Sequence, residues 1–155
     1  MLTLKPIAAG TYPHQVGMPV ALAPAPATRP LFCHKIAAGF PSPAADYTEK
    51  GLDLNAFLIV HKEASFFFEV TGESMIGIGI MPGDFVLVDR AVPPAHGHLV
   101  LAVIDGEYTL KRLYRQHGVI ELHPENPAFS PIRLIDGNEL EVWGVVRSVV
   151  RKLRV

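Results

Sequence analysis

Residues 96–113 read HGHLVLAVIDGEYTLKRL, and this stretch predicts a β-hairpin. Leu99–Ile104 and Glu107–Tyr114 are rich in β-branched and aromatic residues, which favour strands. Asp105-Gly106 separates the two runs by two residues, and a two-residue type I′ turn needs positive φ at both positions, which Asp and Gly tolerate. We therefore expect two antiparallel strands joined by a tight turn.

Similar apolar runs lie on both sides of this hairpin. The other predicted strands are Phe66–Val70, Phe85–Asp89, Val119–His123 and Glu141–Val150. A short helix is predicted over 53–61. Leu54, Phe57 and Leu58 are spaced i, i+3 and i+4 there, so they would present an apolar stripe to a core. The sequence thus predicts a mostly β fold, a compact and largely antiparallel domain of about 100 residues with one short helix.

Charged residues and prolines are unevenly distributed along the 155 residues. Residues 1–45 contain three basic residues, no acidic residue and 8 of the 14 prolines. Residues 46–146 contain all 15 acidic residues and seven basic ones, and residues 147–155 add four basic ones, for a net charge of −1. Since proline lacks the N–H that helices and sheets use, we expect a flexible Pro/Ala-rich N-terminal arm followed by a compact acidic body.

The composition also argues against several classes of protein. The longest apolar run has the length of a strand and falls short of the ~18 residues that span a membrane. Cys33 is the single cysteine, so we expect a free thiol in a reducing cytoplasm. The seven histidines lack metal-ligand spacing, so we expect no metal, and no cofactor motif is complete. Residues 1–38 show no helical periodicity, which argues against a helix-turn-helix and sequence-specific DNA binding.

The segment TGESMIGIGIMPG at 71–83 places Ser74 just after an apolar strand and before a glycine-rich turn. Ile76 breaks the GxSxG pattern of hydrolases, and Gly77 breaks the SxxK pattern. Pro82 breaks the GxGxxG pattern of phosphate-binding loops. On spacing alone, this segment is most simply interpreted as a structural strand and turn.

Lys111 lies in the second strand of the predicted hairpin. It shares a strand face with Thr109 and Leu113, but neither face is cleanly apolar, so periodicity leaves its burial open. Most strand lysines are exposed. If Lys111 is buried, its pKa falls and the neutral amine can take a proton from a serine hydroxyl, forming a Ser–Lys dyad. The backbone N–H groups of Ser74 and Met75 would then be placed to stabilise an oxyanion.

Seven ordered blocks of the sequence resemble UmuD-type members of the LexA/UmuD family of self-cleaving Ser–Lys peptidases, peptidase family S24. The blocks are GFPSPAADY at 39–47, LDLN at 52–55, GESM at 72–75, PGDFVLVDR at 82–90, HGHLVLAVIDGEYTLKRL at 96–113, NPAFSPI at 126–132 and LEVWGVV at 140–146. They extend from about Gly39 to Leu153. The resemblance implies the signal-peptidase-like β fold of the LexA/UmuD C-terminal domain.

The resemblance also implies the site. The family's nucleophile falls on Ser74, its general base on Lys111, and its scissile bond on Ala38-Gly39. Residues 1–38 would then be an arm removed by self-cleavage, and residues 39–155 the Ser–Lys peptidase-like domain. UmuD itself has cysteine before that glycine, so Ala-Gly here is similar to the LexA form.

The function implied by the resemblance is that of an SOS-response mutagenesis protein. Cleavage would be stimulated by the RecA filament on single-stranded DNA, and the trimmed homodimer would join a UmuC-like Y-family polymerase in error-prone translesion synthesis. Two alternatives remain beside it. One is a non-cleaving module that binds a polymerase or regulates it. The other is a peptidase acting in trans like type I signal peptidases, which the lack of an apolar anchor in the sequence disfavours.

Overall fold

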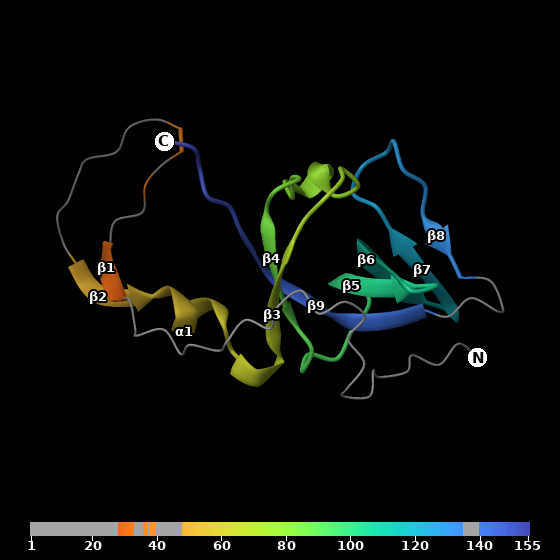
Figure 1. Ribbon diagram of the computed structural model, residues 1–155, viewed down its shortest axis with the longest axis horizontal. Helices are drawn as coiled ribbons and strands as arrows, with labels where there is room; N and C mark the ends of the chain where they lie inside the picture. Colours follow the sequence, from red (N-terminus) through yellow and green to blue (C-terminus); the bar gives the residue numbers. More distant parts are fainter. Residues whose placement is uncertain (1–27, 33–35, 37, 40–47, 135–139) are drawn as a thin grey trace. The chain divides into compact units, whose positions relative to one another are not determined.

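The computed structural model describes residues 28–32, 36, 38–39, 48–134 and 140–155 (Figure 1). The described residues divide into two compact units. His61–Val155 belong to the larger unit, and the described residues up to Val60 belong to the smaller one. Within these described ranges, no helix is long and apolar enough to cross a membrane.

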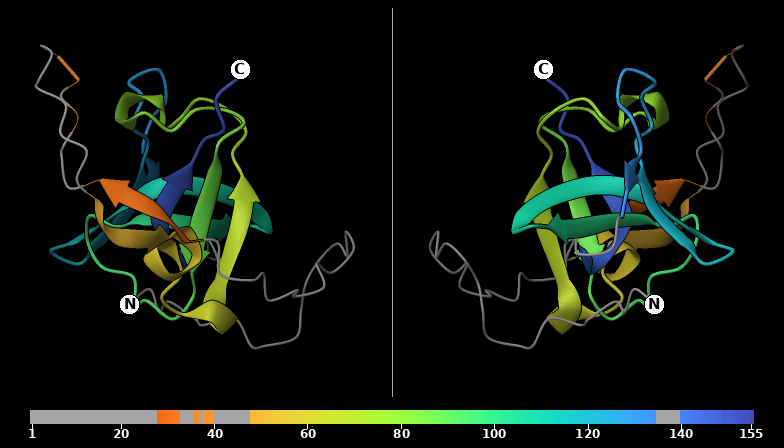
Figure 2. Two further views of the ribbon diagram at one scale, coloured as in Figure 1. Left: turned by 90° about the vertical axis from the view of Figure 1, so that its left-hand side faces the viewer. Right: turned by 90° about the vertical axis from the view of Figure 1, so that its right-hand side faces the viewer.

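The larger unit is built on one seven-stranded sheet, in which every neighbouring pair is antiparallel. Its strands are β3 (Ser65–Glu69), β4 (Phe85–Asp89), β5 (Leu99–Ile104), β6 (Glu107–Gln116), β7 (Val119–His123), β8 (Ile132–Arg133) and β9 (Leu140–Val150). They lie in the order β3-β4-β9-β5-β6-β7-β8. The sheet is strongly twisted, so that β5 and β6 run across the direction of β3 and β4 (Figure 2). The predicted mostly antiparallel β fold is confirmed.

The β5–β6 hairpin forms where the sequence predicts it. Ile104 pairs with Glu107, and the two turn residues between them have positive φ, 49° at Asp105 and 87° at Gly106. These are the dihedral signs that a type I′ turn requires. The predicted strand continues two residues further, to Gln116, because a second turn with positive φ follows it.

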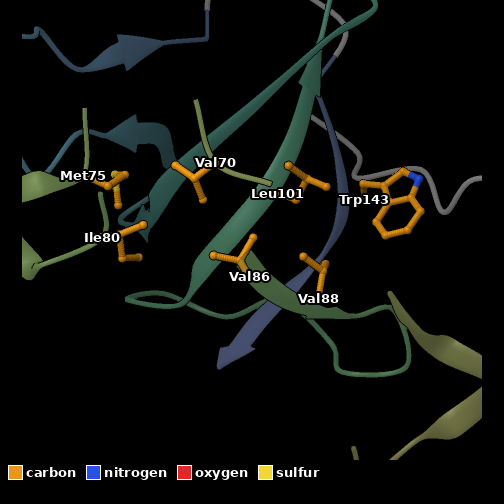
Figure 3. Packing of buried hydrophobic residues seen from close by; sticks show 7 residues of the cluster. All are labelled: Val70, Met75, Ile80, Val86, Val88, Leu101 and Trp143. Carbon is orange, nitrogen blue, oxygen red and sulfur yellow. The ribbon is translucent and has the colours of Figure 1, made fainter. Parts of the chain in front are cut away.

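Apolar side chains on the two faces of the sheet form two buried clusters. The first consists of Val70, Met75, Ile80, Val86, Val88, Leu101 and Trp143 (Figure 3). Phe66 and Phe68 pack edge-on against the Trp143 ring at centroid distances of 5.2 and 5.0 Å. The second cluster consists of Val100, Ala102, Leu113, Leu122, Leu140 and Val145. Neighbouring residues of β5 thus enter different clusters, as the alternation of a strand requires.

The smaller unit contains two strands that the sequence did not predict. β1 (Thr28–Phe32) pairs antiparallel with β2 (Thr48–Asp53), and β1 lies within the predicted N-terminal arm. Pro30 made this segment a poor strand candidate, but a two-stranded sheet consists of edge strands, where proline is tolerated.

The helix that follows β2 is shorter than predicted. α1 spans Leu54–Leu58, and Asp53 caps it by accepting a hydrogen bond from the Asn55 N–H at 3.0 Å. Leu54 and Phe57 are 58% and 66% exposed, so the expectation that they face a core is wrong for the structure described. The helix ends at Leu58, Ile59 is extended, and a 3₁₀ turn, Lys62–Ala64, leads into β3.

Candidate active site

Ser74 lies in a loop, residues 71–84, that connects β3 to β4 and is here called the Ser74 loop. Two backbone hydrogen bonds close its base: Val70 N–H donates to the Asp84 carbonyl, and Gly83 N–H donates to the Val70 carbonyl, both at 2.8 Å. Met75 and Ile80 anchor the loop by placing their side chains in the first buried cluster (Figure 3). The residue beside Ser74 is therefore fixed by packing, which restricts where the serine hydroxyl can lie.

Asp84 and Arg151 fasten the loop from the side of β9. The buried Asp84 carboxylate accepts a hydrogen bond from Met81 N–H at 2.8 Å and pairs with the Arg151 guanidinium at 2.5 and 2.6 Å. Arg151 also donates to the Gly79 carbonyl at 2.6 Å. The guanidinium and the Met81 N–H lower the pKa of Asp84 to about 2. This pair joins the end of the last strand to the second half of the loop, residues 79–84.

Lys111 is buried, with 8% of its surface exposed. It lies in the middle of β6, opposite Val100 of β5, and Val100 and Leu113 on the same face are fully buried. Strand lysines are usually exposed to solvent, but Lys111 is not, because Ser74 of the loop between β3 and β4 lies against its amine. The question that periodicity left open is settled by contacts distant in sequence.

The Lys111 amine meets three oxygen atoms. Its Nζ lies 2.8 Å from Ser74 Oγ, 2.9 Å from Thr109 Oγ1 and 3.0 Å from the Leu110 carbonyl oxygen. An ammonium can donate to all three. A neutral amine has two N–H donors for Thr109 and Leu110, which leaves its lone pair for the Ser74 hydroxyl proton. The arrangement thus supports proton transfer from serine to lysine.

Burial also adjusts the chemistry of the amine. Desolvation lowers the pKa of Lys111, because removing the ammonium from water costs more than removing the neutral amine. A larger share of the side chain is therefore in the neutral, proton-accepting form at a given pH than in an exposed lysine. The site thus has a serine hydroxyl, a base within hydrogen-bonding distance, and groups that orient the base.

Thr109 is a contact that the sequence did not assign to the site. The signal was present, because Thr109 and Lys111 are two residues apart on one strand and share a face. The sequence does not show that this face is buried. On an exposed face, a threonine two residues from a lysine would not indicate a functional site.

The other predicted site residues are placed differently. Ala38 and Gly39 are exposed in the stretch between β1 and β2 of the smaller unit. Their assignment as the scissile bond, and that of the Ser74 and Met75 N–H groups to oxyanion binding, stay predictions. Within the part of the chain described, no group of three or more His, Cys, Asp or Glu residues is arranged to hold a metal ion. Cys33 lies outside the described residues.

Comparison with known proteins gives the family. Residues 30–147 match the model described as Peptidase S24-like. Protein SamA of Salmonella typhimurium is 45% identical over 131 residues, which cover 84% of this chain and 91% of SamA. Protein MucA of Salmonella typhimurium is 40% identical over 119 residues, covering 76% and 80%. The LexA repressor of Syntrophotalea carbinolica is 45% identical over 89 residues, covering 57% of this chain and 44% of the repressor.

The antiparallel β fold and these matches define a class, the self-cleaving serine peptidases. The chain belongs to the Peptidase S24-like family, as a UmuD-type member of its LexA/UmuD group. The resemblance inferred from the seven sequence blocks is thereby confirmed. Membership associates the chain with the SOS response and DNA repair.

Proposed function

We propose that this protein cleaves its own backbone between Ala38 and Gly39, with Ser74 as nucleophile and Lys111 as general base. The observation that supports this most directly is the 2.8 Å separation of Lys111 Nζ and Ser74 Oγ. A lysine that is buried and hydrogen-bonded to a serine hydroxyl has the geometry of an activated nucleophile.

The reaction proceeds in two stages, formation of an ester on Ser74 and hydrolysis of that ester. Neutral Lys111 takes the Ser74 Oγ proton while Oγ attacks the Ala38 carbonyl carbon, and the N–H groups of Ser74 and Met75 stabilise the oxyanion. The Lys111 ammonium then protonates the Gly39 nitrogen as the peptide bond breaks, leaving an ester between Ser74 and residues 1–38. Water, deprotonated by Lys111, attacks this ester and releases the Ala38 carboxylate, and Ser74 recovers its proton.

The trimmed chain, residues 39–155, is proposed as the active form. Its role would be that of a homodimer that joins a UmuC-like Y-family polymerase in translesion synthesis, in the cytoplasm. A RecA filament on single-stranded DNA would stimulate cleavage by favouring the conformation in which residues 38–39 reach Ser74, since a binding partner shifts an equilibrium by its differential affinity for the two states. The family membership supports these proposals.

The test is self-cleavage of the purified chain, followed by intact mass at pH 7 and at about pH 10, where more Lys111 is neutral. We expect loss of residues 1–38 and faster loss at the higher pH. Ser74→Ala and Lys111→Ala should remain intact. Exposed residues of the same types give matched controls, Ser130→Ala and Lys62→Ala, which should cleave like the wild type.

A wild-type chain that stays intact at both pH values and with RecA filament would contradict self-cleavage. It would favour the alternative of a non-cleaving module that binds or regulates a polymerase. Mixing Ser74→Ala, carrying a mass tag, with wild type shows whether one chain cuts another.

A further inference from the structure

The Ser74 loop is held on its other side by the segment that follows β7, and the two lie side by side in both views (Figures 1 and 2). Glu125 N–H donates to the Ser74 carbonyl at 2.8 Å, and Gly77 N–H donates to the Glu125 carbonyl at 2.7 Å. The Asn126 side-chain amide donates to the Glu73 carbonyl at 2.9 Å. The backbone of Glu125 therefore contacts the nucleophile's own residue and the turn three residues later.

This contact is too close for a side chain at residue 77. A Cβ built on Gly77 would lie 2.2 Å from the Glu125 carbonyl oxygen, well inside van der Waals distance. The position of Glu125 and the position of the Ser74 loop are thus mutually fixed. A movement of Glu125 would be transmitted to the Ser74 loop through two hydrogen bonds, one of them to Ser74 itself.

The Glu125 side chain, in turn, is tied to the strand of the base. Its carboxylate pairs with Arg112 Nε, and Arg112 Nη1 donates to the Gly97 carbonyl at 2.7 Å. Arg112 is the residue after Lys111 on β6, and both partners of the ion pair are partly shielded from water. A continuous chain of contacts therefore runs from the strand of Lys111 through Arg112 and Glu125 to Ser74.

We propose that Arg112 and Glu125 are positioning residues, which hold the Ser74 loop at the distance from β6 that places Ser74 Oγ beside the Lys111 amine. The inference rests on the proposed function for its catalytic consequence. Neither side chain contacts the reacting atoms. Because a misplacement of about 1 Å can slow a reaction about 100-fold, loosening this contact should slow cleavage without unfolding the domain.

The first experiment measures the self-cleavage rate constant of Arg112→Gln and Glu125→Ala from pH 7 to pH 10. We expect the rate to fall about 10-fold or more at every pH, with an unchanged pH midpoint, because burial of Lys111 is kept. Exchange of the partners in Arg112→Glu/Glu125→Arg should recover part of the rate. Arg133→Gln is the matched control, because Arg133 pairs with Glu121 at 2.9 Å without contact to the loop.

The second experiment measures hydrogen exchange in the Ser74 loop and does not depend on cleavage. We expect the Gly77 and Glu125 amides to exchange faster in Arg112→Gln than in wild type or Arg133→Gln, at a temperature where circular dichroism shows all three folded. Wild-type rates of both cleavage and exchange in the folded variants would overturn the inference. If the wild-type chain does not cleave, the proposed function is contradicted, but the positioning role can still be tested by hydrogen exchange. Equal exchange of the Gly77 and Glu125 amides in Arg112→Gln and in wild type would then reject the positioning role.

Discussion

Lys111 illustrates how one residue obtains its chemistry from its surroundings. An exposed lysine is a poor base at neutral pH, and nothing within β6 itself would change that. Here the Ser74 loop lies against the amine, burial lowers its pKa, and two oxygen atoms besides Ser74 Oγ receive its N–H groups. The same surroundings thus determine both where the Lys111 amine lies and how strongly it binds a proton.

The two acceptors predict a distinct role for Thr109. Thr109→Val keeps the shape of the side chain but removes the hydroxyl that accepts from Nζ at 2.9 Å. The amine then has one acceptor fewer to orient it, so we expect self-cleavage to slow about 10-fold or more at all pH values from 7 to 10. Thr109→Ser should retain most of the wild-type rate constant. Equal rates for Thr109→Val and wild type would contradict the orienting role.

Burial of an ammonium also predicts a cost in stability. The folded pKa of Lys111 lies below 10.5, so the folded state binds fewer protons than the unfolded state between those two pKa values. Burying the Lys111 ammonium therefore lowers the free energy of unfolding by its full amount when the pH is below the folded-state pKa. This loss disappears as the pH rises toward the pKa of the unfolded chain. In a Ser74→Ala background, which keeps the chain intact, we expect Lys111→Met to raise Tm at pH 7 and to raise it less at pH 10.

Thermal unfolding followed by circular dichroism measures this difference. Lys62→Met in the same background is the control, because Lys62 is exposed and should give similar Tm shifts at the two pH values. A Lys111→Met chain that is less stable than its parent at pH 7 would show that the amine's hydrogen bonds outweigh its desolvation.

At the scale of elements, strand and turn patterns were predictable because they are local. Asp105-Gly106 determines a turn by its own dihedral preferences, and β5 and β7 begin and end where the sequence predicts. β1 was missed because, among the described residues, it is paired with β2, which lies about 20 residues later in the chain. Burial of Lys111 and its approach to Ser74 depend on a contact between residues 37 positions apart in the sequence. Strand periodicity could not predict that contact, and the family resemblance did.

The Asp84–Arg151 pair makes the Ser74 loop sensitive to acid. The pKa of Asp84 in the folded state is about 2, below the ordinary value of 3.8. The ionised Asp84 carboxylate therefore stabilises the fold above pH 3.8, and this contribution is lost as pH falls toward 2. Arg151→Gln should therefore lower Tm more at pH 6 than at pH 2.5. Lys152→Gln, an exposed neighbour, should show no such pH dependence, and equal losses from Arg151→Gln at both pH values would contradict the pairing.

At the scale of the whole molecule, the first buried cluster is organised around its single tryptophan. Trp143 contacts Phe66 and Phe68, and the Arg90 guanidinium lies 4.7 Å from the centre of its ring. Trp143→Ala should lower the free energy of unfolding by about 3–5 kcal/mol, because it removes a large buried ring and leaves a cavity. Urea unfolding followed by circular dichroism measures the loss.

Phe129→Ala serves as the control for this prediction. Phe129 is exposed, so its truncation should change the free energy of unfolding by no more than about 0.5 kcal/mol. A similar small change for Trp143→Ala would show that the cluster tolerates the cavity.

The place of β9 in the sheet has a consequence for the timing of synthesis. β9 comes last in chain order, yet it lies between β4 and β5 and pairs with both. The strands next to the Ser74 loop and the strands next to Lys111 meet only through it within the sheet. The seven-stranded sheet therefore cannot be completed until a ribosome has synthesised residues 140–150, so its two groups of strands join into one sheet only late in synthesis.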